Sequence, residues 1–303
     1  MPAPRFLTVC LNPVLQKTLR LAALQRGRVN RLLHHRLDAS GKGINVTRVL
    51  SQLGEQVIHM TQLGGRFRDS FLDLAARDQL EIAWRESQAE IRFCYTIIEE
   101  GSAQATEVVE ESEPVAPETE PLLDALYEEL LEQCDWVVFS GSKAAGFSHG
   151  VVPRWVERAK VRGCRVVLDV RGADLTGALP HSPTVIKPNF DEFVQTFFGS
   201  GSAAAGPELL GAVEEEMQRL VRRYGCAVVV TRGTDETLFA DSEGVHRMPV
   251  AAVPAISSTG SGDAFTAGLV AALAHDVRLA DAVRQGQHCG ALNAAQERPG
   301  VIR

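Results

Sequence analysis

Residues 258–265 read Ser258-Thr259-Gly260-Ser261-Gly262-Asp263-Ala264-Phe265, and a run of small and apolar residues continues from there to residue 274. This composition predicts a helix over 264–274 that packs closely against its neighbours. The two glycines let successive backbone N–H groups converge on one point, and the positive end of the helix dipole is directed there. The stretch therefore predicts an anion-binding helix start with a carboxylate at its edge.

The carboxylate of Asp263 has two interpretations. It can accept a proton from an attacking hydroxyl group while the backbone N–H groups beside it stabilise negative charge on a phosphoryl group. It can also be an ordinary acidic residue that complements the helix dipole. This stretch by itself leaves both open.

A second glycine-rich element, Gly41-Lys42-Gly43-Ile44-Asn45, opens another predicted helix. Its glycines permit close backbone approach, Lys42 supplies a cation, and Asn45 can donate and accept hydrogen bonds to sugar hydroxyls. The element lacks the G-x-x-x-x-G-K-[ST] spacing of a Walker loop. By itself it does not identify a ligand.

A third element, Lys187-Pro188-Asn189, lies where a predicted strand passes into a helix. Pro188 can end the strand, and Asn189 can cap a helix that carries Glu192 in its first turn. Capping does not explain Lys187. We therefore interpret Lys187, Asn189 and Glu192 as groups that handle nucleotide phosphates and, through water, Mg²⁺.

Short apolar runs alternate with amphipathic stretches along the chain. The runs predict buried parallel strands at residues 6–11, 57–63, 136–140, 166–169, 185–187 and 227–231. Helical periodicity is clear at residues 44–53, 121–133, 151–161 and 208–224. This alternation predicts an α/β fold with right-handed crossovers and helices covering the sheet.

Two segments break this alternation. Residues 15–37 contain a basic, β-like stretch, and residues 91–100 with 104–111 read as two strands around a Gly101-Ser102 turn. We expect them to form a small β lid, from about 15–37 and 80–112, within a single domain of residues 1–303. Exposed lid strands need hydrogen-bond partners, so we also expect a homodimer that pairs two lids.

Composition narrows the class of protein. The 303 residues carry a formal net charge of -7, which argues against a nucleic-acid footprint because phosphate-backbone binding needs clustered cations. No apolar run approaches the ~20 residues of a membrane span, and the start MPAPRFLTV is unlike a signal peptide. We therefore expect no membrane association and a cytoplasmic location, with the six scattered cysteines as reduced core thiols.

These elements, in this order, carry a family resemblance. Together with Leu11-Asn12-Pro13 and Ser140-Gly141-Ser142, they make the chain similar to the PfkB family of ribokinase-like kinases, in the branch of 1-phosphofructokinase and tagatose-6-phosphate kinase. The resemblance covers nearly the whole chain. It implies a three-layer α/β/α fold with a mostly parallel central sheet, and transfer of a phosphoryl group from ATP, with Mg²⁺, to a primary hydroxyl of a ketohexose phosphate.

The same resemblance assigns roles to individual residues. Asp263 is the implied catalytic base, with an anion hole formed by Gly260, Ser261 and Gly262. The implied substrate-binding residues are Gln16, Arg28, Gly41, Lys42, Asn45, Arg92 and Ser140, of which Arg92 is expected to hold the phosphate already on the substrate. The implied nucleotide-binding residues are Lys187, Asn189, Glu192, Thr231, Gly233, Gly262 and Asn293, with Glu192 also reaching Mg²⁺ through water.

The sequence departs from the family mainly on the sugar side. Gln16 replaces an aspartate and brings no charge, Ser257 replaces an acidic or amide residue, and Lys143 replaces an apolar one. Fructose 1-phosphate, tagatose 6-phosphate and fructose 6-phosphate therefore all remain candidate substrates. A kinase of an unphosphorylated sugar or nucleoside, and a catalytically silent sugar-phosphate sensor, remain alternatives. The retained Asp263 argues against the sensor.

Overall fold

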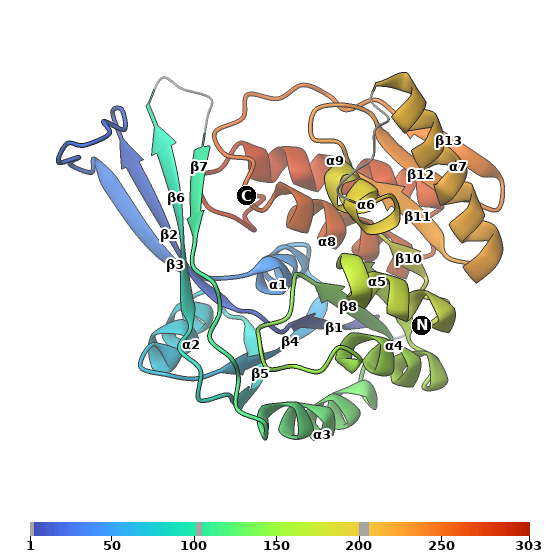
Figure 1. The fold of residues 1–303 in the computed structure, drawn as a ribbon, viewed down its shortest axis with the longest axis horizontal. Coiled ribbons are helices and arrows are strands. Elements are labelled where there is room, and N and C mark those ends of the chain that lie inside the picture. The colour runs from blue at the N-terminus through green and yellow to red at the C-terminus, as the bar shows by residue number, and fades with distance from the viewer. Residues whose placement is uncertain (1–2, 101–104, 200–205) are drawn as a thin grey trace.

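The computed structural model describes residues 3–100, 105–199 and 206–303. Within these residues a nine-stranded sheet runs in the order β13-β12-β11-β10-β9-β8-β1-β4-β5 (Figure 1). The strands from β5 to β11 pair in parallel, and β12 and β13 add an antiparallel edge. The bounds are β1 Arg5–Cys10, β4 Gln56–Leu63, β5 Glu81–Glu86, β8 Trp136–Ser140, β9 Arg165–Asp169, β10 Val185–Ile186, β11 Ala227–Val230, β12 Thr237–Asp241 and β13 Gly244–Met248.

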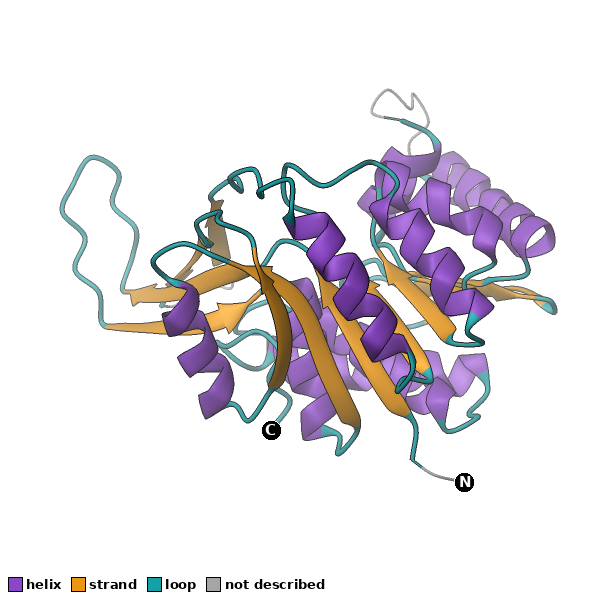
Figure 2. Cartoon of the chain, turned by 90° about the horizontal axis from the view of Figure 1, so that it is seen from below, coloured by secondary structure: helices purple, strands orange, loops and turns teal. Residues whose placement is uncertain are grey.

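Helices cover both faces of this sheet and complete three layers (Figure 2). One face carries α3 Thr119–Leu131, α4 Val151–Val161, α5 Gly172–Ala178, α6 Phe190–Phe197 and α7 Pro207–Tyr224. The other carries α1 Lys42–Gln52, α8 Ser261–Ala274 and α9 Leu279–Ala294. A short 3-10 helix at Leu179–His181 follows α5, and α2 Arg68–Arg77 packs beneath the lid.

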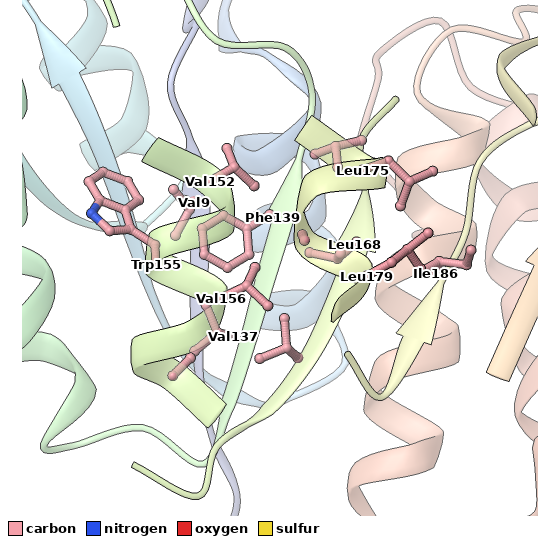
Figure 3. Close-up of a cluster of buried hydrophobic side chains, with 14 of the residues drawn as sticks. Val9, Val137, Phe139, Val152, Trp155, Val156, Leu168, Leu175, Leu179 and Ile186 are labelled. Atoms are coloured by element: carbon pink, nitrogen blue, oxygen red, sulfur yellow. The ribbon is translucent and has the colours of Figure 1, made fainter. Parts of the chain in front are cut away.

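The two cores follow from the period of two residues along a buried strand. On β8, Val137 and Phe139 face the α4 side, whereas Trp136 and Val138 face the α8 side. Figure 3 shows Phe139 beside Trp155 and Val156 of α4. Because both faces are covered, the strand is apolar at nearly every position, which is the pattern that predicted it.

The predicted strands and helices of the main sheet are all present, with ends shifted by a few residues. The start of α8 is the informative difference, because this helix begins at Ser261 and not at residue 264. Gly260 takes the left-handed conformation, with φ 81°, as the residue before the helix. Asp263 therefore lies in the first helical turn.

The lid is a separate four-stranded sheet in the order β3-β2-β6-β7. Its strands are β2 Val14–Leu21, β3 His34–Ser40, β6 Arg92–Glu99 and β7 Ala105–Val109. The lid boundary at residue 80 was wrong, because β5 pairs with β4 at the edge of the main sheet. Residues 87–91 lead from that edge into β6. The expected Gly101-Ser102 turn lies outside the described residues.

All six cysteines are buried, and none forms a disulfide within the described part of the chain. Burial raises the pKa of the Cys134 thiol to about 12, so this thiol stays protonated at neutral pH. The expectation of reduced core thiols agrees with this. No helix in the described ranges is both long and apolar enough to cross a membrane.

Helix α8, which carries Asp263, packs unusually close to α9. A Cβ added at Gly268 would lie 2.7 Å from the Cys289 Sγ atom and 2.8 Å from the carbonyl oxygen of Gln285. Both are closer than unstrained contacts allow. A larger residue at position 268 must therefore push the two helices apart.

We expect Gly268→Ala to lower the free energy of unfolding by roughly 1–3 kcal/mol, because overpacking outweighs the gain in helix propensity. The matched control is Gly211→Ala in α7, where an added Cβ meets no other described atom within 4 Å. That variant should be stabilised by up to about 1 kcal/mol. Denaturant unfolding of both variants measures this, and equal stabilities would contradict the close packing.

Candidate active site

A cleft of about 650 Å³ lies between the lid and the carboxyl ends of the parallel strands. Open α/β sheets bind ligands at this edge, because the loops that leave the strands diverge there. Sequence segments far apart in the chain supply its walls. The lining includes Gln16, Arg92, Cys94 and Glu107 from the lid sheet, Gly41, Lys42 and Asn45 from the start of α1, Asp169, Lys187, Asn189, Glu192 and Thr231 from the strand ends and α6, and Thr259, Gly260, Gly262 and Asp263 from the start of α8.

Asp263 lies at the bottom of this cleft and is 6% exposed. Its Oδ2 atom accepts a hydrogen bond of 2.8 Å from the Asn45 Nδ2 atom. Burial raises the pKa of Asp263 to about 6, against the opposing effect of Lys42, and the negative charge of Asp169 raises it further. A carboxylate with this pKa is ionised at neutral pH and more basic than usual, as a general base requires.

The loop before α8 keeps one part of the expected arrangement, a glycine in the left-handed conformation directly before the helix. A Cβ on Gly260 would lie 2.7 Å from the Pro299 Cβ atom, so the close approach of the C-terminal segment also requires glycine here. Gly260 and Gly262 line the cleft at the positive end of the α8 dipole. Ser261 does not line it, and its N–H donates to the Ser258 carbonyl oxygen at 3.1 Å. The backbone N–H of Ser261 is therefore not free to bind an anion in this structure.

Two lysines meet one buried carboxylate in the cleft. Asp169, at the end of β9, is 1% exposed, and its Oδ1 atom lies 3.4 Å from the Lys187 Nζ atom and 3.9 Å from the Lys42 Nζ atom. Burial alone would raise the pKa of Asp169, but Lys187 and Lys42 hold it below the ordinary value. The sequence analysis missed Asp169. Its position, a carboxylate closing a buried apolar run, was the available signal.

The nucleotide-side residues form the predicted capped helix. Asn189 and Glu192 make a capping box, in which the Asn189 Oδ1 atom accepts from the Glu192 N–H at 2.8 Å and the Glu192 Oε2 atom accepts from the Asn189 N–H at 3.1 Å. The Glu192 Oε1 atom pairs with the Lys42 Nζ atom at 2.9 Å. Burial would lower the pKa of Lys42, but Asp169 and Glu192 raise it above its ordinary value. Lys42 is therefore a fixed positive charge in the cleft.

The lid contributes one cation and one carboxylate to the cleft. The Arg92 Nη1 atom donates to the Glu110 carbonyl oxygen at 3.0 Å, while its buried Nε atom has no hydrogen-bond partner among the described residues. The Glu107 Oε1 atom accepts from the Thr259 hydroxyl group at 2.7 Å. The sequence analysis assigned no role to Glu107. This hydrogen bond links β7 to the loop that precedes α8.

Besides Ser261, four predicted site residues lie away from the cleft lining. Arg28 is exposed in the loop between β2 and β3, and Gly233 lies in the turn after β11. Ser140 donates to the Asp169 Oδ2 atom at 3.2 Å and thus supports the cleft from behind. Asn293 is fully buried; its Nδ2 atom donates to the Thr259 carbonyl oxygen and its Oδ1 atom accepts from the Gly300 N–H, so both ends of the amide have partners within the protein.

The three sequence departures have local explanations. Gln16 is buried, and its Nε2 atom donates to the Thr96 hydroxyl group at 2.7 Å, so the amide is held within the lid sheet. Lys143 pairs with Asp174 of α5 and does not line the large cleft. Ser257 is buried, and its hydroxyl accepts from the Thr259 N–H at 3.3 Å. None of these contacts disturbs Asp263.

Comparison with known proteins agrees with this geometry. The pfkB family of carbohydrate kinases matches residues 10–301. The chain belongs to this family. Its fold is that of a variant of phosphofructokinase-2 from Escherichia coli, with a TM-score of 0.86 and 22% identity over 99% of this chain and 95% of that one. A possible 1-phosphofructokinase from Thermotoga maritima also gives 0.86, with 23% identity over 97% and 93% of the two chains.

The ribokinase of Thermotoga maritima shares the fold more distantly, with a TM-score of 0.74 and 15% identity over 98% of this chain and 95% of the ribokinase. The protein is thus a pfkB carbohydrate kinase of ribokinase-like fold that uses ATP with Mg²⁺. The donor set fits a metal held through water. Both Glu192 carboxylate oxygens already have partners in the capping box and on Lys42, whereas the Asp169 Oδ1 atom lies between two ammonium groups that would repel a cation.

The raised pKa of Asp263 also means that ionisation of this carboxyl group destabilises the folded protein. We expect Asp263→Asn to raise the free energy of unfolding at pH 7.5 by roughly 1–3 kcal/mol, because the amide keeps the shape without a desolvated charge. Below pH 4 both states of the wild type hold the proton, so the gain should vanish. The gain in free energy of unfolding should grow from pH 4 to 6, where Asp263 is ionised only in the unfolded wild type, and should stay constant above pH 6.

Urea unfolding between pH 3.5 and 8 measures this gain. The control is Asp281→Asn on α9, because Asp281 is solvent-exposed and hydrogen bonds from Arg284 and Arg278 lower its pKa. It should give no such increase with pH. A pH-independent effect of Asp263→Asn would contradict the raised pKa.

Proposed function

We propose that this kinase transfers the γ-phosphoryl group of ATP to a primary hydroxyl group of a ketohexose phosphate, with Asp263 as the general base. The observation that carries the proposal is the site of Asp263. It is a buried carboxylate with a pKa of about 6, next to a glycine-rich helix start, in a cleft that also contains Arg92. These are the parts that in-line phosphoryl transfer to an alcohol requires.

In this mechanism Asp263 accepts the proton of the attacking hydroxyl group. Asn45 holds the carboxylate by its Oδ2 atom, so the Oδ1 atom is the one we assign to the acceptor. The backbone around Gly262 and the positive end of α8 stabilise negative charge on the transferred group. Mg²⁺, when bound with ATP, neutralises charge on the phosphates.

Lys187 is assigned to the phosphates of the nucleotide, and Asn189 and Glu192 to water molecules of its metal. Lys42, which pairs with Glu192, keeps its assignment to the acceptor. Thr231 supports this side because its carbonyl oxygen accepts from the Phe190 N–H at 2.9 Å, which joins β11 to the start of α6. The Glu107–Thr259 hydrogen bond, which joins β7 to the loop before α8, supports a lid that closes over Asp263. A closed lid would keep water from competing with the acceptor.

The assignment to a phosphorylated sugar rests on charge. Arg92 brings a guanidinium group with an unpartnered buried Nε atom to the lid side of the cleft, where a neutral sugar would need only hydroxyl partners. A similar structure is phosphofructokinase-2 from Escherichia coli in complex with fructose 6-phosphate, at 23% identity. This likeness supports fructose 6-phosphate among the three candidate ketohexose phosphates.

The alternatives predict different chemistry from the same cleft. A kinase of an unphosphorylated sugar or nucleoside would leave Arg92 without a ligand anion. A silent sugar-phosphate sensor would not need the raised pKa of Asp263. Product formation across a panel of charged and neutral acceptors separates the three functions.

The lid also supports a homodimer. Strand β7 is a sheet edge with exposed Val108 and Val109, and unpaired edges favour association. The molecular mass measured by sedimentation tests this pairing, because it distinguishes a dimer from a monomer. Buried free thiols and ATP chemistry fit a cytoplasmic enzyme.

The test of the proposed function is the turnover of Asp263→Asn. We expect a loss of roughly 10²–10⁴ in kcat, because the amide cannot take the proton, with the KM for ATP little changed. In the wild type, kcat/KM should rise with pH around a midpoint of about 6, the pKa of Asp263. The substrate phosphate also titrates at about pH 6, so an equal rise in Asp263→Asn would belong to the substrate. Near wild-type kcat in the variant would refute Asp263 as base.

Substrate class is tested by Arg92→Ala. We expect a loss of about 1.5–3 kcal/mol in kcat/KM for ketohexose phosphates, the worth of one charge-assisted hydrogen bond. The KM for ATP and the kcat/KM of uncharged acceptors should change little. Arg20→Ala is the control, since Arg20 lies on the lid but pairs with Glu100, outside the cleft lining. Equal losses for charged and neutral acceptors would refute the assignment.

A further inference from the structure

Asp169 is a buried charge for which the proposed mechanism has no use. Among the described residues, its Oδ1 atom has no hydrogen-bond partner, although two ammonium groups lie within 3.9 Å of it. The other oxygen is anchored from two elements. The Oδ2 atom accepts from the Ser140 hydroxyl at 3.2 Å on β8 and from the Thr266 hydroxyl at 3.0 Å on α8.

We propose that Asp169 is a positioning residue, whose anchored carboxylate holds the ammonium groups of Lys42 and Lys187 around a single oxygen atom and thereby sets their places beside Asp263. Asp169 itself touches neither nucleotide nor acceptor in this role. It acts through the two lysines. The proposal rests on the proposed kinase function for its effect on turnover.

The two lysines depend on Asp169 to different degrees. Lys42 also pairs with Glu192 at 2.9 Å, so it keeps a partner without Asp169. Lys187 is 2% exposed, and Asp169 is its ion-pair partner in the described structure. Its other electrostatic neighbours are the Phe265 ring, 5.9 Å from the Lys187 Nζ atom, and the carboxylate of Asp263. Without Asp169, the buried charge of Lys187 is therefore the less compensated of the two.

The charge of Asp169 also reaches Asp263. The groups that face Asp263 are Lys42 and Asn45 of α1, Asp169 of β9, Lys187 after β10 and Cys10 of β1. The pKa of Asp263 is raised by burial first and by Asp169 as well, while Lys42, Asn45 and Lys187 lower it. Neutralising Asp169 removes one raising influence and leaves the lowering ones. The pKa of Asp263 should then move towards its ordinary value.

The experiment compares Asp169→Asn with the wild type and with the control Asp174→Asn. Asp174, on the adjacent α5, pairs with Lys143 outside the large cleft. For Asp169→Asn we expect kcat to fall at least about tenfold, and the acidic limb of kcat/KM to move roughly 0.5–1 pH unit lower. The dissociation constant of ADP, measured without Mg²⁺, should change less than about threefold, because the added net positive charge offsets the loosened lysines. The control should change none of these.

Three results would overturn the proposal. One is an unchanged kcat, and another is an acidic limb that stays in place while kcat falls. The third is a rate that excess Mg²⁺ restores, because Asp169 would then be a metal ligand. Asp169→Glu keeps the negative charge, so the acidic limb of its kcat/KM profile should stay at the wild-type pH. If Asp169→Asn does not fold, Ser140→Ala tests the anchor, with a few-fold loss expected in kcat and none in the KM of the sugar phosphate. A wild-type kcat in Ser140→Ala would refute the positioning role of Asp169.

Failure of the proposed function can be recognised separately. ADP binding and the pH dependence of unfolding need no acceptor sugar. If the wild type phosphorylates no ketohexose phosphate, those two measurements still test Asp169. In the wild type, the ionisation of Asp263 lowers the free energy of unfolding progressively up to near pH 6. In Asp169→Asn, the upper end of this pH range should move to a lower pH.

Discussion

The hydrogen bond between Asn45 and Asp263 joins the two helices on which the cleft depends. Its direction is fixed, because the Asn45 Oδ1 atom already accepts from the Ser40 hydroxyl and from the Arg48 guanidinium group. Only the Nδ2 atom can then face Asp263. Both helices follow a glycine with positive φ, Gly41 and Gly260, which lets their first turns lie open to the cleft. One buried amide thus aligns the candidate base with the glycine-rich start of α1.

A buried ionic network supports this alignment from the C-terminal segment. Arg298 pairs with Asp38 of the lid strand β3 and with Asp78 after α2, and Arg48 pairs with the same Asp78. Burial would raise the pKa of Asp78, but Arg298 and Arg48 hold it below its ordinary value. These ion pairs connect the lid, α1 and the C-terminal segment. They hold Pro299 close to Gly260. Such networks fix geometry more than they stabilise the fold.

Charge is distributed unevenly across the cleft. Lys42 and Lys187 stand at the strand ends with Asp169 and Glu192 as their partners, whereas Arg92 approaches from the lid sheet. Two anionic ligands, one on each side of Asp263, would satisfy this arrangement without leaving a cation buried and unpaired. Asp263 keeps a raised pKa among these cations because burial outweighs their attraction. The same desolvation makes the Asp263 carboxylate more basic and lowers the stability of the fold.

The sequence by itself determined the alternation of strands and helices, since apolar runs and amphipathic periods depend on local spacing. It also determined the helix start at Asn189 and the presence of helices after the glycines at 41 and 260, because glycine conformation and capping act within a few residues. The start of α8 at Ser261, ahead of the expected residue 264, came from the structure. The tertiary structure decided the rest. It placed β5 in the main sheet, took Asn293 and Ser140 out of the cleft lining, and brought Asp169 between two lysines distant in sequence. Pairing partners, burial and electrostatic neighbours arise from contacts between remote segments, which local pattern does not contain.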